Sequence, residues 1–428
     1  MRVIVVGGGW AGCAAAVSAG KAGADVFLLE RTDMLLGTGL VGGIMRNNGR
    51  LTATEELKAM GGGDLFSVIE SNFLHKDITF PGHLHASLYD VSTMEPKIRR
   101  FLEASGICIE TGCRITDVQM DGCHVSAVLG KQAGKEVRFD GDMFIETTGT
   151  AGPPANCARH GNGCAMCILR CHSFGGRVSI AAKAGVAEIN GQKGNQIGAV
   201  SGSCKLHKES LAPDLRKQLN DTGVAVIPLD EHLRMTGKLS LKACQQYAIA
   251  DFEQNVILLD TGHAKLMTPF FPLDVLRKIP GLENARFEDP YAGGMGNSVR
   301  YMGMSPRDDA LKVDGVDNLF CAGEKAGLMV GHTEAICTGT LAGINAVRQL
   351  RGKTAVKLPE ESVIGDAVAF VRQQMQTPEG LGLKFTFSGS VLFERMKEKG
   401  WYLTDPAVIQ DRVQKAGLKN ILTSIQDR

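Results

Sequence analysis

Four of the twelve cysteines in this 428-residue chain lie close together, in the pattern C-x6-C-x2-C-x3-C. They are Cys157, Cys164, Cys167 and Cys171. The last three have the spacing of bacterial ferredoxins, in which thiolates bind the irons of a 4Fe–4S cluster. Because such a cluster carries single electrons, this segment predicts a one-electron redox centre.

Other interpretations of these cysteines stay open. The first gap is longer than in ferredoxins and His172 replaces the usual proline, so His160 or His172 competes for the fourth ligand position. Four thiolates also suit a structural zinc ion, although zinc ribbons usually pair two distant C-x-x-C knuckles. Cys164 and Cys167 also form a C-x-x-C pair that could act as a redox dithiol. Inert thiols are the simplest alternative.

Three histidines are candidates for acid–base chemistry, because imidazole titrates near neutral pH. His332 directly precedes a predicted long helix, and we expect it to protonate or orient a substrate, with a structural loop histidine as the alternative. His83 and His85 lie on one face of an extended segment near Tyr89; surface or core histidines are the simpler interpretation. Three loop residues could bind a carboxylate or phosphate, or be ordinary surface groups: Arg46, Arg300 and Tyr301.

The elements that must position these groups begin at the N-terminus. Arg2 to Val6 is an apolar run typical of a buried parallel strand, and it runs into Gly7-x-Gly9-x-x-Gly12 and a helix of small residues. A second predicted strand ends at Glu30, where a carboxylate can accept a hydrogen bond from a ribose hydroxyl. This order predicts a dinucleotide site whose pyrophosphate lies at the helix N-terminus.

Further contacts to that nucleotide are expected from the glycine loop and from the segments beside it. The segment from residue 31 to residue 49 is rich in Gly, Thr and Asn, as close passage along a pyrophosphate requires. The predicted strand from Phe144 also runs into a glycine turn. The expected contacts are Gly7, Gly9, Trp10, Ala11, Gly12, Glu30, Arg31, Thr38, Gly39, Thr148 and Gly149.

A second strand–loop–helix lies far along the chain. A buried strand from Leu319 to Ala322 leads through Gly323 and Glu324 into a helix of small residues from Thr333 to Leu350. This segment resembles the C-terminal FAD motif of two-motif flavoproteins of the glutathione-reductase-like superfamily. It is especially similar to the RNA-modifying flavoproteins of the TrmFO type, and the segment 279–285 resembles them as well.

The resemblance implies FAD as the cofactor, because an NAD-binding domain would not need the second motif. It places Glu324 at the ribityl chain. The helix N-terminus at Thr333 then faces the flavin edge, where it stabilises the anion of the reduced flavin. A plain core helix is the alternative interpretation. A nicotinamide reductant stays open.

The remaining pattern predicts an α/β protein. Residues 1–171 and 310–358 are expected to form a Rossmann-like FAD-binding domain with a parallel sheet and a β-meander. Residues 172–309 form an inserted mixed α+β domain, and 359–428 a mostly helical C-terminal extension. Helices are expected at 52–60, 94–104, 179–187, 238–255 and 273–279, and one begins at Asp405-Pro406.

Composition excludes some classes of protein. The net charge of +1 and the pI of about 7.5 give no global attraction to nucleic acid or membranes. No run of eighteen apolar residues predicts a membrane span, and the N-terminus is itself a core strand without a signal peptide. Twelve cysteines in such a chain indicate a reducing cytoplasm.

These features predict a cytoplasmic FAD-dependent oxidoreductase, with a 4Fe–4S cluster or a zinc ion, that exchanges electrons between a small organic substrate and a one-electron carrier. A flavin-dependent tRNA uridine modification enzyme of the TrmFO type is one alternative, and an electron-transfer subunit is another. No cysteine lies between Cys13 and Cys108, where the tRNA methyltransferase pattern expects one. Nucleic acid is thus disfavoured as a partner but not excluded, and a homo-oligomer stays open.

Overall fold

The computed structural model describes residues 1–149, 178–193, 196–197, 199–201, 204–234, 237, 239, 245–267, 271–288, 297–300 and 303–423. At its centre lies a five-stranded parallel sheet in the order β21-β10-β1-β2-β6. Its strands are β1 (Arg2–Val6), β2 (Asp25–Leu29), β6 (Cys108–Glu110), β10 (Met143–Glu146) and β21 (Leu319–Cys321). Parallel strands bury both faces, which explains their near-continuous apolar sequences.

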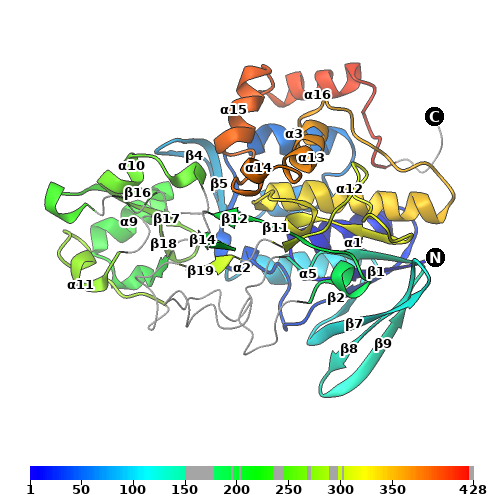
Figure 1. Cartoon of the computed structure of the whole chain (residues 1–428). Helices are drawn as coiled ribbons and strands as arrows, with labels where there is room; N and C mark the ends of the chain where they lie inside the picture. Colours follow the sequence, from blue (N-terminus) through cyan, green and yellow to red (C-terminus); the bar gives the residue numbers. More distant parts are fainter. Residues whose placement is uncertain are drawn as a thin grey trace.

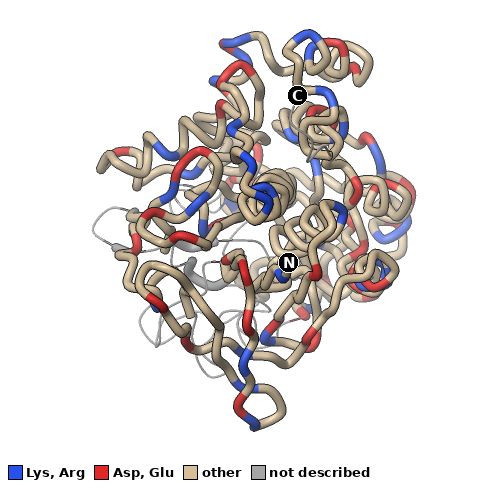
Figure 2. Tube along the Cα trace, turned by 90° about the vertical axis from the view of Figure 1, so that its right-hand side faces the viewer, with Lys and Arg blue, Asp and Glu red and all other residues tan. Residues whose placement is uncertain are grey.

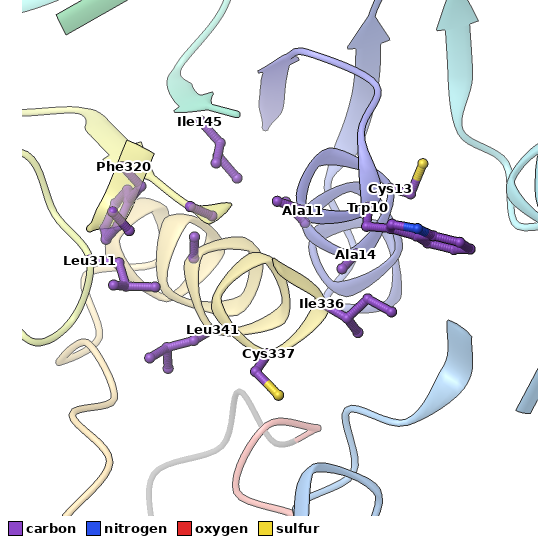
Figure 3. Packing of buried hydrophobic residues seen from close by; sticks show 14 of the residues in the cluster. Trp10, Ala11, Cys13, Ala14, Ile145, Leu311, Phe320, Ile336, Cys337 and Leu341 are labelled. Atoms are coloured by element: carbon purple, nitrogen blue, oxygen red, sulfur yellow. The ribbon is translucent and has the colours of Figure 1, made fainter. Parts of the chain in front are cut away.

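Two helices rich in small residues, α1 (Trp10–Lys21) and α12 (His332–Leu350), pack against each other beside this sheet (Figure 3). A Cβ atom at Gly339 would lie 2.2 Å from the Ala11 carbonyl oxygen, and one at Gly343 would lie 2.4 Å from that of Ala15. Only glycine allows the two backbones to approach so closely. The two predicted nucleotide-binding helices, 322 residues apart in the chain, are therefore direct neighbours in space.

The segments between the strands of the parallel sheet form further small sheets and short helices. A β-meander is formed by β7 (Cys113–Asp121), β8 (His124–Gln132) and β9 (Lys135–Asp140), which project together from the sheet (Figure 1). A second small sheet joins β3 (Ile44–Arg46) to the hairpin of β4 (Phe73–Phe80) and β5 (His83–Tyr89). Short helices lie between these strands: α2 (Gly39–Gly42), α3 (Gly49–Ala59), α4 (Asp64–Glu70) and α5 (Met94–Ala104).

The inserted region is built around an antiparallel sheet in the order β15-β18-β17-β16. Its strands are β15 (Cys204–Leu206), β16 (Val224–Pro228), β17 (Asn255–Asp260) and β18 (Ala264–Leu266), with helices α9 (Pro213–Thr222), α10 (Asp251–Gln254) and α11 (Leu273–Leu276). Buried side chains between Cys204 and Phe287 form a hydrophobic cluster of their own. Of the helix predicted over 238–255, the described residues show an α-helix only at Asp251–Gln254, with a 3-10 turn at Gln245–Tyr247 and a strand that begins at Asn255, so most of this prediction is wrong.

Short elements connect this region to the rest. They are α8 (Ile180–Lys183), the pairs β11 (Ile189–Asn190) with β20 (Gly303–Met304), β12 (Gln192–Lys193) with β13 (Gln196–Ile197) and β14 (Ala199–Ser201) with β19 (Asn297–Arg300), and 3-10 turns at Lys208–Ser210, Glu231–Leu233, Gln245–Tyr247 and Gly323–Ala326. The helices predicted over 179–187 and 273–279 are thus shorter than expected.

The C-terminal part is helical, as predicted. It contains α13 (Val363–Gln374), α14 (Pro378–Leu381), α15 (Ser390–Glu398) and α16 (Pro406–Lys415). The Asp405 carboxylate accepts a hydrogen bond from the Ala407 N–H, so the predicted start of the last helix is confirmed. These helices contribute to the same hydrophobic cluster as the parallel sheet.

The predicted fold class is confirmed by this arrangement: a parallel sheet with a meander, an inserted mixed region and a helical tail (Figure 1). The domain boundaries at 171, 309 and 358 stay a prediction. Among the helices of the described residues, none has the length and apolarity that crossing a membrane would require.

Candidate functional site

The three motif glycines occupy three different environments at the carboxyl end of β1. Gly7 has a φ of +107°, and a Cβ there would lie 2.4 Å from the Thr147 carbonyl oxygen. A Cβ at Gly12 would lie 1.9 Å from the Gly7 carbonyl oxygen, so this glycine permits the contact of helix and strand. At Gly9, however, the nearest atom to a Cβ would be 4.0 Å away. Gly7 and Gly12 thus serve the fold, while Gly9 leaves open space above the backbone.

The open space at Gly9 lies at the start of α1. Gly9 is the N-cap residue and no side chain caps the helix, so the N–H groups of the first turn and the positive end of the helix dipole can serve an anion. Trp10 and Ala11 follow Gly9 and are buried. This geometry is what a bound pyrophosphate needs.

Glu30 lies directly after β2 and is buried, as a ribose-binding carboxylate should be. Its Oε2 atom accepts the Gly8 N–H at 2.7 Å, and its Oε1 atom accepts the N–H and the hydroxyl of Thr32 at 2.9 and 3.0 Å. Each carboxylate oxygen can accept two hydrogen bonds, so capacity for a ribose hydroxyl remains. The carboxylate thus also fixes the glycine loop, a role that the sequence did not indicate.

The neighbouring strand β10 ends at the same edge. The Thr147 hydroxyl lies 2.9 Å from the Val6 carbonyl oxygen and 2.7 Å from that of Gly7, so it can donate to either. Thr148 and Gly149, the predicted contacts, are half-buried directly after the buried strand. Gly149 has a φ of +67°, and among the described residues no atom lies within 4 Å of a Cβ position there. Like Gly9, it leaves room beside the backbone at the carboxyl edge.

Three predicted contacts remain in the first half of the chain, and one of them, Gly39, packs against Trp10. A Cβ at Gly39 would lie 2.4 Å from the indole Nε1 atom, so this glycine allows close packing on the ring. Thr38 is the N-cap residue of the one-turn helix α2, without a side-chain cap. Burial lowers the pKa of the Arg31 guanidinium. The contacts of all three with a nucleotide stay a prediction.

The second motif meets the first at this edge. Gly323, with a φ of +64°, donates its N–H to the Thr338 hydroxyl at 2.9 Å, and a Cβ there would lie 2.9 Å from the Ala11 Cβ. Glu324 is half-buried within the 3-10 turn Gly323–Ala326. Helix α12 begins at His332 after the N-cap residue Gly331, again without a side-chain cap. Its first turn therefore brings a second helix N-terminus, with its positive dipole end, to this end of the sheet.

His332 lies among aromatic rings at this helix start. Its ring centroid is 5.9 Å from that of Tyr89 and 6.1 Å from that of Trp10. A Cβ at Gly42 would lie 2.0 Å from the imidazole Cε1 atom, so α2 also approaches this ring closely. The Tyr89 hydroxyl donates to the Gly39 carbonyl oxygen at 2.6 Å and lies 3.4 Å from His332 Nδ1. Thr333, the next residue, donates its hydroxyl to the Met45 carbonyl oxygen at 2.9 Å.

The structure does not place the other two candidate histidines with His332. His83 is buried; its Nδ1 atom is 2.7 Å from the side chain of Asn47 and its Nε2 atom is 3.0 Å from the Gln246 carbonyl oxygen. His85 is half-exposed, with a φ of +55° and a contact to Asp77 at 2.7 Å. The expectation that both share one face is therefore wrong, because register shifts interrupt the pairing of the two strands.

The structure describes two of the three loop residues that were expected to bind a carboxylate or phosphate, Arg46 and Arg300, and not the third, Tyr301. Arg46 pairs with Glu70 at 2.8 Å and with Glu55 at 3.5 Å, so its charge is already balanced within the protein. The backbone of Arg300 ends strand β19, whereas Tyr301 lies outside the described residues.

Two buried charge clusters beside the site were missed by the sequence reasoning. In the first, Arg50 from α3 pairs through Nε with both carboxylate oxygens of Glu334, the third residue of α12, at 3.0 Å. Glu334 also accepts the Thr386 hydroxyl at 2.7 Å and the Phe387 N–H at 2.9 Å. This cluster ties the start of α12 to the C-terminal region. The sequence shows a glycine-rich loop before Arg50 and an acidic residue, Glu334, after Gly331. It does not indicate that Arg50 and Glu334 form an ion pair.

The second cluster lies at the end of β10. The Lys325 ammonium is fully buried, contacts Glu188 and lies 3.7 Å from Glu146. Glu146 accepts the Ile180 and Ala181 N–H groups at 2.8 and 2.9 Å, at the start of α8. The only indication of the role of Lys325 in the sequence is its position directly after Gly323-Glu324 of the second motif.

The cysteine segment predicted to bind a cluster or zinc, with Cys157, Cys164, Cys167 and Cys171, lies outside the described residues, as do His160 and His172. Its chemistry stays a prediction. Among the residues that the structure describes, no group of three or more Cys, His, Asp or Glu side chains could hold a metal ion. Burial raises the pKa of the Cys13 and Cys321 thiols to about 12, so these cysteines are neutral core residues.

The site fits an extended dinucleotide such as FAD. Two uncapped helix starts and the open positions at Gly9 and Gly149 lie along one edge of the sheet, and ligands of parallel α/β sheets bind at this edge. Lys, Arg, Asp and Glu positions are interspersed along the chain trace (Figure 2). This agrees with the net charge of +1 and indicates no single basic stripe along the drawn part of the trace.

Known proteins share this fold and parts of this sequence. A TrmFO protein of Caldicellulosiruptor bescii, described as methylenetetrahydrofolate–tRNA-(uracil-5-)-methyltransferase, is 37% identical over 99 residues, which are 23% of this chain and 22% of that protein. The Thermus thermophilus protein of the same description is 35% identical over 109 residues, 25% of this chain and 23% of that protein. The sequence matches thus span less than a quarter of each relative's length.

Solved structures extend the likeness in fold to nearly the whole chain. The structure of Aquifex aeolicus GidA covers 98% of this chain and 73% of its own, with a TM-score of 0.66 at 17% identity. At that identity, the likeness concerns the fold alone. The sequence profile described as "Glucose inhibited division protein A" matches residues 2–231 and 261–354, more than half of the chain. This chain therefore belongs to the GidA family.

Proposed function

We propose that this protein is a flavoenzyme that binds FAD across its two glycine motifs. The observation that carries the proposal is the meeting of two uncapped helix starts, α1 and α12, at the carboxyl edge of one parallel sheet. The start of α1, with Gly9, would hold the pyrophosphate and Glu30 the ribose, while Glu324 would contact the ribityl chain. Bound there, the flavin would supply two-electron redox chemistry.

The residues at the start of α12 would then act on the reactive end of the cofactor. The positive end of the helix dipole at Thr333 would stabilise negative charge on the reduced ring. Because the Tyr89 hydroxyl donates its proton to Gly39, it can only accept from His332 Nδ1. Nδ1 then carries the ring proton and Nε2 is the acceptor of the neutral imidazole. His332 would thus be held in a fixed orientation beside the flavin, where it would orient or protonate a substrate.

For the substrate, we propose a uridine in tRNA. The supporting observation is the sequence likeness to proteins described as tRNA-(uracil-5-)-methyltransferases, which favours this function over iron–sulfur electron transfer. Because the net charge of the protein is near zero, contacts to the phosphates of tRNA must come from a few local lysines and arginines. The expected affinity for tRNA is therefore modest, and its dependence on salt reflects only those few phosphate contacts.

The test uses the purified full chain loaded with FAD, an unmodified tRNA transcript, a chemical reductant and methylenetetrahydrofolate. Nucleoside mass spectrometry should detect 5-methyluridine, and less of it with His332→Ala. A His85→Ala variant is the matched control, because His85 pairs with a surface aspartate. No modified uridine, together with no salt-dependent tRNA binding, would contradict the substrate proposal while leaving the FAD proposal standing.

The cysteine spacing supports a second candidate, an oxidoreductase that passes electrons from a small organic substrate to a one-electron carrier. Its support is the ferredoxin-like pattern of Cys164, Cys167 and Cys171 in the sequence. Anaerobic purification followed by iron and sulfide analysis tests this candidate. About four irons per chain support it. Zinc or no metal would exclude the cluster.

A further inference from the structure

A pocket of about 590 Å³ lies away from the sheet edge, between the β4–β5 hairpin, β16 and α15. Its wall is mostly aromatic and aliphatic: Phe80, Pro81, Leu84, Val226, Phe393 and Tyr402. Its volume lies within the usual range of small-molecule sites, about 300–1,000 Å³. Figure 1 shows the three elements that form it converging from distant parts of the chain.

Exposed apolar side chains gather at this pocket. Leu84 and Val226, which line it, are 48% and 39% exposed. These two are among only six large hydrophobic side chains that are exposed in the described part of the chain. Clustered apolar exposure marks a surface that a ligand or partner covers.

The tip of the hairpin is held in a fixed shape. Asn48 has a φ of +50°, an unusual conformation for a residue other than glycine. Its side chain accepts the Leu84 N–H at 2.8 Å and donates to the carbonyl oxygens of Gly82 and Ser388 at 3.0 and 2.9 Å. These bonds join the hairpin to the segment before α15. The pocket is therefore pre-formed, and strained backbone of this kind concentrates at ligand sites.

One charged group points to the chemistry of the occupant. Among the described residues, Lys397 is the one Lys, Arg, Asp or Glu side chain of the lining, so no carboxylate of the described chain lines the pocket. The ion pair of Lys397 with Glu394 is exposed to solvent, and such pairs are weak enough to exchange.

We propose that this pocket binds a planar aromatic molecule with one anionic group, such as an aromatic carboxylate. The rings would lie against Phe80 and Phe393 with Leu84 and Val226 at the rim, and the anion would meet Lys397. The aromatic wall supplies apolar and edge-to-face contacts, since Phe393 and Tyr402 already form an edge-on pair 5.0 Å apart. The lysine supplies the charge complement.

The probe is 2-naphthoate, compared with the neutral analogue 2-naphthalenemethanol, and binding to the full chain is measured by isothermal titration calorimetry. The variant Leu84→Asp brings a like charge to the rim and should weaken naphthoate binding at least about tenfold. Val408→Asp is the matched control, because Val408 is also 48% exposed but lies on α16, outside the lining. Lys397→Met should remove the preference for naphthoate over the alcohol.

Saturable binding of naphthoate that is lost in Leu84→Asp and kept in Val408→Asp supports the site. Three results would overturn it: no saturable binding to the wild type, equal weakening by both aspartate variants, or a preference for the anion that survives in Lys397→Met. Flavin content and melting temperature are measured for each variant, so that a folding defect is recognised separately from a loss of the pocket.

Discussion

Substitution of single motif glycines by alanine should distinguish the residues needed for FAD binding from those needed for folding. Among the described residues, a Cβ at Gly9 would meet only the Leu36 carbonyl oxygen, at 4.0 Å, whereas a Cβ at Gly12 would lie 1.9 Å from the Gly7 carbonyl oxygen. Gly9→Ala therefore adds a methyl group to open space, and Gly12→Ala adds one inside a packed contact. The first should impair FAD binding with little effect on the fold, and the second should impair the fold itself.

The expected magnitudes follow from the same geometry. Gly9 has φ −67° and ψ −179°, a conformation that alanine adopts freely. Loss of the glycine N-cap costs about 0.5–1 kcal/mol, and the stiffer unfolded chain returns about 0.4–1 kcal/mol. The stability of the cofactor-free protein should thus change by less than about 1 kcal/mol. For Gly12→Ala, overpacking against backbone should cost about 3 kcal/mol or more.

The assay combines urea unfolding of the cofactor-free protein with FAD titration followed by flavin fluorescence. In Gly9→Ala the Kd for FAD should rise at least about tenfold, which is about 1.4 kcal/mol, because the methyl group occupies the space where the pyrophosphate approaches the backbone. The reasoning is refuted if Gly9→Ala binds FAD as the wild type does. It is refuted equally if Gly9→Ala destabilises the cofactor-free protein as much as Gly12→Ala.

Two further predictions concern buried carboxylates. Glu334→Gln leaves the Arg50 guanidinium buried without its counter-charge, and urea unfolding should show a loss of about 3–5 kcal/mol; an unchanged midpoint would contradict the buried pair. Burial raises the pKa of Glu56, although the Ile364 and Val363 N–H groups lower it. The folded protein then binds this proton more tightly than the unfolded chain, so this contribution to stability is complete below the unfolded pKa and is lost as the pH rises through the folded pKa. Glu56→Gln should lack that decline, and parallel pH profiles of wild type and variant would contradict the assignment.

The parts of the fold that could be predicted depend on local sequence. The run from Arg2 to Val6, the glycine spacing and the small residues of α1 and α12 reflect rules that operate within about twenty residues, and the structure confirms the strands and helices expected there. The helix at Met94–Ala104 matches its predicted bounds for the same reason.

The missed features depend on pairing between distant residues. Arg50 meets Glu334, and Lys325 meets Glu188, across more than a hundred residues, so no local pattern reveals either contact. The alternation of side chains along a regular strand places residues i and i+2 on one face, which is why His83 and His85 were expected to share a face. This alternation does not predict the positive φ of His85 or the register shifts in its hairpin. The strand β17, whose Val and Ile residues favour a strand, pairs with β16 from Asn255 onward, at the point where the predicted helix was expected to end.

Binding of FAD across both glycine motifs is tested by the identity and amount of flavin that the full chain releases when it is denatured after purification and reconstitution with FAD. We expect about one molecule of FAD per chain in the wild type and strongly reduced occupancy in Gly9→Ala. A folded wild-type protein that retains no FAD, or that binds FAD equally well with alanine at Gly9, would show that FAD does not bind as proposed.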